Sequence, residues 1–181
     1  MKTDKQFRSP AKDSIILDIK KSKPPSLRFL FSHPAHLIAC GFGSGLSPFA
    51  PGTVGTLFAW ATFYLFRPWM SDLELLGFFI ACFVIGVAAA HKTGADLGVI
   101  DHGSIVWDEI VPFWLVLLFC PAGWLWQTAA FLLFRIFDIV KPQPARYFDT
   151  KVKNGFGVMT DDFFAGVYTV LVLQIASFAL S

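Results

Sequence analysis

The chain has 181 residues, enough for one domain with a substantial core, and a formal net charge of +2 that identifies no class of partner by itself. Hydrophobic residues make up 55% of the chain, aromatic residues 17% and charged residues only 15%, whereas an average soluble domain has about 25% charged residues. This composition favours a lipid-embedded protein. The three cysteines have no paired spacing, which argues against a disulfide framework and a thiolate zinc site.

Residues 1–26 are predicted to form a basic, flexible N-terminal arm that ends in Pro24-Pro25. Eight of the 15 basic residues precede residue 30, and such a segment suits the negatively charged cytoplasmic face of a membrane. A solvated tail explains the arm equally well. Residues 27–181 are then expected to form a single membrane-embedded domain.

Two features precede the first long apolar segment. Residues 27–40 are apolar but are interrupted by His33-Pro34, which predicts a half-inserted or interfacial segment and leaves open whether it crosses the bilayer. The sequence GFGSGLSPFAPGTVG at 41–55 predicts a Gly/Pro-rich re-entrant or interfacial loop. Its backbone N–H groups could cradle a phosphate, and a purely structural turn is equally consistent with the sequence.

Five apolar segments follow, at about residues 56–70, 75–90, 105–120, 124–140 and 163–180. A membrane-spanning helix needs about 20 apolar residues, so these short segments are expected to extend into polar flanks or to lie partly inside a bundle. The predicted fold is an all-α, polytopic membrane helical bundle with short spanning helices. A soluble helical bundle is the alternative.

The charges of the connecting loops support the membrane interpretation. With the basic arm in the cytoplasm, the loops alternate between outside and inside. The most basic connection, which contains Lys141, Arg146, Lys151 and Lys153, then lies inside, as the positive-inside rule requires. The C-terminus would lie outside if residues 27–40 do not cross.

In this topology most of the acids gather at one membrane face. Only Asp72 and Glu74 lie on the other side. Ionisable residues at such a depth usually face the interior of a bundle and mark function. The acids at or near the cytoplasmic ends are Asp96, Asp101, Asp108, Glu109, Asp138, Asp149, Asp161 and Asp162.

The segment IDHGSIVWDEIVPFW at 100–114 places acids where an apolar helix begins. If the helix continues through Ser104, Asp101 and Asp108 share a face, and if Ser104 caps the helix, Asp101 belongs to a loop. In both cases Asp108 and Glu109 lie in the first turn, where the helix dipole favours negative charge. Ordinary first-turn acids are the structural alternative, but two adjacent acids point about 100° apart and cannot both face water at a lipid boundary.

A second group consists of Arg135, Asp138 and Lys141 in the segment FRIFDIVKPQP. Residues three apart are neighbours on one helical face, and the prolines at 142 and 144 end the helix. The group is either an interfacial ion pair with a snorkelling lysine or a site in which the two cations bind an anion and the acid orients them or binds a metal.

A third group is TDD at 160–162, where Thr160 is expected to cap the last helix and both acids to lie in its first turn. Adjacent carboxylates beside a basic loop also suit a hard cation such as Mg²⁺. The sequence lacks a P-loop, a cysteine phosphatase loop, HExxH and GxSxG. The groups that the sequence does contain are carboxylates, a few basic side chains and a glycine-rich loop. They suit Mg²⁺-assisted phosphoryl chemistry, in which positioning and charge neutralisation dominate.

Four segments in this order resemble the phosphatidylglycerophosphatase A family: GFGSGLSPFAPGTVGTL, DHGSIVWDE, FRIFDIVKPQPARYFD and GFGVMTDDFFAG. The resemblance covers about residues 34–180 and leaves out the basic arm. It implies an integral enzyme of the bacterial inner membrane with its site on the cytoplasmic side. Such an enzyme depends on Mg²⁺ and removes the phosphate monoester from phosphatidylglycerophosphate to give phosphatidylglycerol, a step of phospholipid biosynthesis.

The resemblance and the residue patterns together predict the site. The predicted metal ligands, for one or two Mg²⁺, are Asp108, Glu109, Asp161 and Asp162. The predicted catalytic residues are Asp101, His102, Arg135, Asp138 and Lys141. The predicted substrate-binding residues of the loop are Gly41, Gly43, Ser44, Gly45, Gly52 and Thr53. In this scheme Asp101 or Asp138 activates the attacking water, and the two cations clamp the phosphoryl oxygens.

The predicted partners are the lipid substrate and the membrane, without nucleic acid, and the oligomeric state is left open. A cation transporter or channel with a carboxylate-lined path is the alternative function. Transporter sites lie near the bilayer midplane and often in repeated halves, whereas this chain shows no internal repeat and its acids lie at one face. A non-enzymatic membrane scaffold would explain the apolar helices but not the clustered acids.

Overall fold

The computed structural model describes residues 23–180. The predicted N-terminal arm therefore lies almost entirely outside the described residues. Helices and turns without strands make up the described part, which confirms the all-α prediction. The helices, in chain order, are α2 (Leu27–Leu30), α3 (Pro34–Ala39), the 3₁₀ turn η1 (Gly41–Leu46), α4 (Pro51–Phe66), η2 (Arg67–Trp69), α5 (Asp72–Leu97), α6 (Trp107–Phe119), α7 (Trp124–Val140), α8 (Ala145–Lys151) and α9 (Gly155–Leu180).

Several helices begin earlier or end later than the apolar runs, as expected for short runs that extend into polar flanks. α4 begins at Pro51, inside the predicted loop, since proline at the first helical position has a fixed φ suited to a helix. α5 extends to Leu97 and ends at Gly98, which has a left-handed φ of 72°. Its other end is fixed by a capping box between Ser71 and Glu74.

The two predicted serine and threonine caps are also corrected. α6 begins after Val106 rather than at Ser104, so Asp101 belongs to a loop, while Asp108 and Glu109 do lie in the first turn. α9 begins at Gly155, and the Thr160 hydroxyl donates a hydrogen bond to the carbonyl of Phe156 inside the helix. The acids at 161 and 162 are therefore in the second turn of α9.

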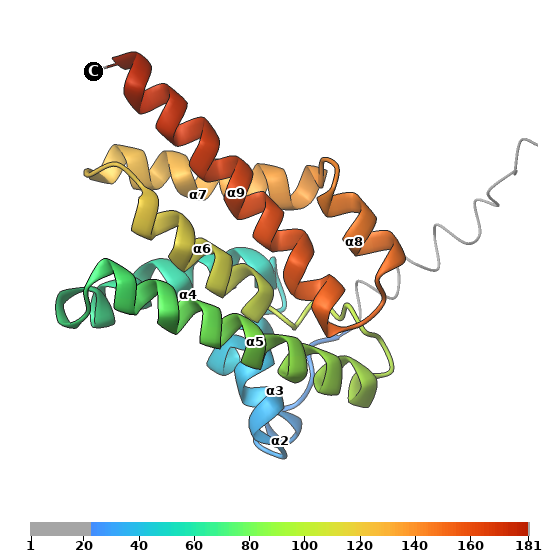
Figure 1. Cartoon of the computed structure of the whole chain (residues 1–181). Coiled ribbons are helices and arrows are strands. Elements are labelled where there is room, and N and C mark those ends of the chain that lie inside the picture. Colours follow the sequence, from blue (N-terminus) through green and yellow to red (C-terminus); the bar gives the residue numbers. More distant parts are fainter. Residues whose placement is uncertain (1–22, 181) are drawn as a thin grey trace, which may run out of the picture.

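α6 forms the centre of the bundle. It lies between α5 and α9, as Figure 1 shows, and also packs against α4. Its side chains are buried on nearly every face, among them Ile110, Phe113 and Val116. Trp114 stacks on Phe79 with ring centroids 5.7 Å apart. A helix that is apolar all round belongs in such a core position.

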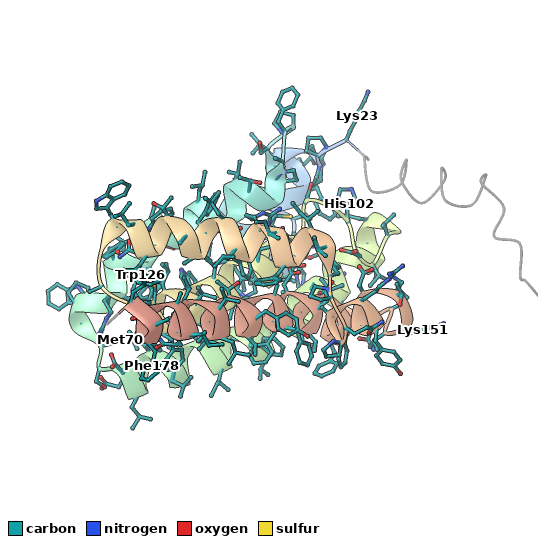
Figure 2. The ribbon with its side chains drawn as sticks, turned by 90° about the horizontal axis from the view of Figure 1, so that it is seen from above. Lys23, Met70, His102, Trp126, Lys151 and Phe178 are labelled. Carbon is teal, nitrogen blue, oxygen red and sulfur yellow. The ribbon has the colours of Figure 1, made fainter. Side chains whose placement is uncertain are left out.

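The helices run back and forth between two ends of the bundle. Figure 2 shows Met70, Trp126 and Phe178 at one end, and His102 and Lys151 at the other. α5 and α9 are long and apolar enough to cross a membrane, by length and composition. Large apolar side chains cover the outer surface, including Ile175 at 69% exposure and Phe178 at 85%. Exposed apolar patches of this extent are typical of a surface that faces lipid or a partner protein.

Candidate active site

Five acidic side chains from three helices are buried together near the end of the bundle that carries His102. Their exposure is between 3% and 9%, whereas Asp and Glu are almost never fully buried unless they are paired. α6, α7 and α9 contact one another at this level. These five residues, called the acid cluster below, are Asp108, Glu109, Asp138, Asp161 and Asp162.

Arg135 of α7 connects one side of the acid cluster to α4 and α6. Its Nη1 atom lies 2.9 Å from Glu109 Oε1 and 2.8 Å from Asp138 Oδ2. The same nitrogen donates a hydrogen bond to Thr56 Oγ1 on α4 at 3.4 Å. The predicted pairing of Arg135 with Asp138 along one helix face is therefore present, and it extends to α4 and α6.

Lys141 holds the other side of the acid cluster. Its Nζ atom forms ion pairs with Asp161, with Asp149 of α8 at 3.2 Å and with Asp162 at 3.9 Å. Lys141 follows α7 and has a φ of +48°, a left-handed conformation that turns the chain away from the helix. Such a conformation costs about 1–2 kcal/mol for a residue other than glycine, and here it places the ammonium group among carboxylates.

The acid cluster contains oxygen atoms without a hydrogen-bond partner among the described residues. They are Asp108 Oδ1, Glu109 Oε2 and Asp162 Oδ1. One oxygen each from Glu109, Asp138 and Asp162 lies within 4.8 Å of the others, an arrangement that could hold a metal ion. Four of the five carboxylates form ion pairs, and they share only two basic side chains, Arg135 and Lys141; buried charge left unpaired is costly. The residues present therefore fit a hard divalent cation, which prefers carboxylate oxygen.

Glycines of α4 and η1 allow the backbone to approach the acid cluster closely. A Cβ atom on Gly52 would lie 1.9 Å from Glu109 Oε1, and one on Gly55 would lie 3.2 Å from Glu109 Oε2. A Cβ atom on Gly45 would lie 2.1 Å from the carbonyl of Ser104, and one on Gly41 would meet Ile110. The glycines therefore have a packing role that the sequence interpretation held open.

The remaining loop residues of the prediction lie at the edge of this contact. Gly43 is half-buried with a φ of +103°. The Ser44 hydroxyl donates a hydrogen bond to the carbonyl of Gly41 at 2.8 Å, and Thr53 is half-buried on α4. Substrate binding by these residues stays a prediction.

His102 and Asp101 lie in the loop between α5 and α6. The backbone N–H of Ser104 donates to His102 Nδ1 at 3.1 Å, so the neutral ring carries its proton on Nε2. Burial lowers the pKa of His102, against the opposing effect of Asp101, which favours this neutral form. Asp101 is half-buried and lines a small pocket together with Asp149, Lys153 and Asp161.

Two residues that contact the site had no predicted role. Asp149 forms an ion pair with Lys141. The two residues are eight apart in the sequence with two prolines between them, so no helical spacing predicted that they would meet. Thr56 accepts from Arg135, but in the sequence it is one threonine at the start of an apolar run. Only the gathering of acids at one membrane face pointed to Asp149.

The acid cluster is buried and paired with Arg135 and Lys141, and it lies at one end of helices whose outer surface is apolar. These features suit a membrane protein with an enclosed polar site. Among known proteins, the family model of Phosphatidylglycerophosphatase A matches residues 37–177. The chain belongs to this family, which confirms the resemblance seen in the four motifs. It is accordingly a phosphatase, a phosphoric monoester hydrolase.

Individual relatives cover most of the chain. Phosphatidylglycerophosphatase A of Escherichia coli strain K12 is 47% identical over 161 residues, which is 86% of this chain and 88% of the relative. Phosphatidylglycerophosphatase A of Haemophilus influenzae is 47% identical over 150 residues, 82% of this chain and 92% of the relative. A relative from Bacteroides thetaiotaomicron, with the provisional name of a phosphatidylinositol-3-phosphatase, is 42% identical over 151 residues, 80% of this chain and 94% of the relative. No solved structure matches the chain.

Proposed function

We propose that this protein hydrolyses phosphatidylglycerophosphate to phosphatidylglycerol, as a step of phospholipid biosynthesis, and that it requires Mg²⁺. The observation that carries the proposal is the acid cluster. It gathers carboxylate oxygens from α6, α7 and α9 beside Arg135 and Lys141, and three of those oxygens have no hydrogen-bond partner among the described residues. Two relatives that bear the name phosphatidylglycerophosphatase A support the choice of substrate.

Glu109, Asp138 and Asp162 are the residues that would hold Mg²⁺, with Asp108 beside them. This division differs from the sequence prediction, because Asp138 lies within the oxygen trio whereas Asp161 is paired with Lys141. The cation would neutralise charge on the phosphate. Arg135 positions Glu109 and Asp138, since its Nη1 atom contacts both carboxylates.

Asp101 is the better placed of the two predicted bases. Asp138 belongs to the oxygen trio that would hold the metal ion, whereas Asp101 lies at the small pocket beside Asp161. In the proposed step a water oxygen forms a bond to phosphorus, the ester P–O bond breaks, and the water proton passes to Asp101. The departing glycerol oxygen takes a proton from the solvent, to which Asp101 then returns the proton that it accepted. Lys141, which is held among three carboxylates, can contact a phosphoryl oxygen when it exchanges one of them.

We further propose a multi-pass arrangement in the bacterial inner membrane with the acid cluster on the cytoplasmic side. The cluster lies at the end of the bundle that also carries Lys151 and Lys153, and the positive-inside rule places such a loop in the cytoplasm. The head group of a phospholipid in the inner leaflet would then meet the cluster from the same side. An acid cluster at one end of the bundle, rather than at its middle, favours an enzyme over a transporter.

The experiment measures phosphate release by purified protein in detergent with two lipid monophosphates, phosphatidylglycerophosphate and phosphatidylinositol-3-phosphate. The second lipid is included because of the provisional name of the Bacteroides relative. We expect turnover of phosphatidylglycerophosphate with Mg²⁺ and its loss when a chelator is added. Preferential turnover of the inositol lipid would overturn the substrate assignment, and unchanged turnover with chelator would overturn the metal requirement.

The matched variants are Asp108→Asn and Asp72→Asn. Asp108 is buried at the start of α6, whereas Asp72 is exposed at the other end of the bundle and paired with Arg67. We expect Asp108→Asn to lose at least about 100-fold in turnover, because it alters charge that acts on the reacting phosphate, and Asp72→Asn to keep wild-type turnover. Both variants should insert into the membrane normally. Wild-type activity of Asp108→Asn would remove that residue from the site.

A further inference from the structure

A groove of about 660 Å³ lies between α5, α6, α8 and α9. Figure 1 shows α5 and α9 on either side of α6, with α8 beside the start of α9. Thr160 is the only polar residue that lines the groove, and the others are aromatic or aliphatic or, at position 112, proline. Its volume lies in the range of about 300–1,000 Å³ that is common for small-molecule sites.

The groove runs lengthwise along the bundle, because each long helix contributes a stripe of residues at helical spacing. α5 contributes four residues from Leu76 to Phe83, and α6 contributes four from Val111 to Phe119. Residues three and four apart lie on one face of a helix. Ile80 is 58% exposed and Phe119 is 47% exposed, so the groove opens onto the apolar outer surface of the bundle.

One end of the groove lies close to the acid cluster along two helices. Asp108 precedes Val111 by three residues and Pro112 by four, so it lies on the same face of α6, about one helical turn or 5.4 Å further toward the helix start. On α9, Thr160 lines the groove and Asp161 follows it directly. The groove therefore opens onto the outer surface and ends within about one helical turn of the acid cluster.

We infer that this groove holds one acyl chain of the lipid monophosphate while its phosphate lies in the acid cluster. The inference rests on the proposed function and adds to the same site the part that binds the hydrocarbon chain of the substrate. We take the occupant to be a hydrocarbon chain, because a groove lined by apolar side chains offers no partners to the polar groups of an extended peptide backbone. The charged head group attached to this chain would lie at the end of the groove nearest Asp108.

The groove contributes to catalysis by fixing the depth of the substrate in the bilayer. Burying a chain in protein rather than in lipid yields little free energy, since lipid tails are as apolar as leucine. The gain is positional, because a chain held along α6 presents its phosphate at the level of the acid cluster. Misplacement of a substrate by about 1 Å can cost about 100-fold in rate.

The test fills the groove and compares two substrates that share one head group. Phosphatidylglycerophosphate with two palmitoyl chains reaches into the groove, whereas the dihexanoyl form is too short to fill it. The filling variants are Ile80→Trp and Leu115→Trp, from α5 and α6. The matched control is Leu132→Trp, since Leu132 is 55% exposed on α7 and does not line the groove.

We expect each filling variant to lower kcat/KM for the dipalmitoyl lipid, relative to the dihexanoyl lipid, by at least about tenfold through mispositioning. The control should keep this ratio within about twofold of wild type, as surface substitutions generally do. Two filling variants on different helices guard against one that does not fold. An unchanged ratio in a folded filling variant would overturn the inference. Failure of the wild type to hydrolyse either lipid would instead overturn the proposed function.

A second measurement separates substrate from bulk lipid. A phosphatidylglycerophosphate with a diazirine at the end of one acyl chain is photolysed with the full chain in detergent, and the labelled peptides are mapped. We expect labels on α5 and α6 that excess dipalmitoyl phosphatidylglycerophosphate removes and excess dipalmitoyl phosphatidylcholine does not. Equal competition by both lipids would show a groove filled by bulk lipid and contradict the inference.

Discussion

The contact between Gly52 and Glu109 shows how single residues set the geometry of the site. The carboxylate of Glu109 occupies the space where any larger residue at position 52 would place its Cβ atom. Glu109 is thereby confined between α4 and Arg135, which binds it from the other side. A residue without a side chain thus acts on the acid cluster by leaving room for the carboxylate of Glu109.

Gly52→Ala is expected to keep the fold and lose at least about 100-fold in phosphatase activity. Its Cβ atom would lie 1.9 Å from Glu109 Oε1, so the carboxylate must move, and the end of a flexible side chain can do so without unfolding the bundle. Circular dichroism checks the helical content, and phosphate release checks the activity.

The matched control is Gly77→Ala on α5, where a Cβ atom would meet nothing within 4 Å. This change should leave activity unaltered and stabilise the protein by about 0.5–1 kcal/mol, because alanine is the better helix former. Equal activity of the two variants would show that the position of Glu109 does not matter to turnover.

At the scale of the elements, Arg135 is the residue that ties α7 to α4 and α6. Its contacts with Thr56 and Glu109 cross two helix interfaces, while its contact with Asp138 stays within α7. The equivalent surface pair is Arg67 with Asp72, at the opposite end of the bundle, where the two side chains are 41% and 74% exposed. The two arginines therefore make the same kind of ion pair in different surroundings.

Arg135→Met is expected to destabilise the protein by about 3–5 kcal/mol, because it leaves buried carboxylates without their cation. Arg67→Met should cost less than about 1 kcal/mol, as exposed ion pairs generally do. Denaturant titration in detergent measures both values. A similar decrease in the free energy of unfolding for the two variants would mean that burial of an ion pair does not increase its contribution to stability.

The sequence predicted the helical segments better than their ends. The N-cap of α9 was placed six residues too late, at Thr160 instead of Asn154, because TDD at 160–162 resembles a capping sequence. The cap is Asn154 instead, whose side-chain oxygen accepts from the N–H of Gly157 at 3.0 Å. Gly155 then packs so closely that its Cβ would lie 2.0 Å from the carbonyl of Val87. Asn154 and Thr160 are both plausible caps by sequence. The packing of Gly155 against α5 decides between them, and a single sequence does not show that packing.

The same limit applies to the site. The gathering of the acids at one end followed from apolar segment order and loop charge, and the structure brings five of them together. The partner of each charge was harder to predict. Arg135 and Asp138 are three residues apart, so helical spacing suffices. Arg135 and Glu109 are 26 residues apart on different helices, and only packing of α6 against α7 joins them.

At the scale of the whole molecule, the two ends of the bundle differ in chemistry. One end carries the acid cluster and the basic connection around α8, and the other carries Met70, Trp126 and the end of α9. This polarity is what the positive-inside rule uses to orient a membrane protein. The proposed topology can therefore be tested with labels at each end.

Cysteine labelling in intact cells with a membrane-impermeant maleimide checks the orientation. Trp69 is 84% exposed at one end, and Lys151 is exposed at the other. We expect Trp69→Cys to react from outside the inner membrane and Lys151→Cys to react only after lysis. The unaltered chain, with its native Cys40, Cys82 and Cys120, measures the background. The reverse pattern would place the acid cluster outside.

The contribution of α9 to the acid cluster has a consequence for biogenesis. Asp161 and Asp162 follow Glu109 and Arg135 in the chain, so the ribosome delivers the earlier half of the constellation first. Until the final helix is threaded into the bilayer, Lys141 lacks two of its counter-ions and the oxygen trio lacks its third member. In the proposed mechanism, nascent chains therefore cannot cleave phosphate until α9 has joined the bundle.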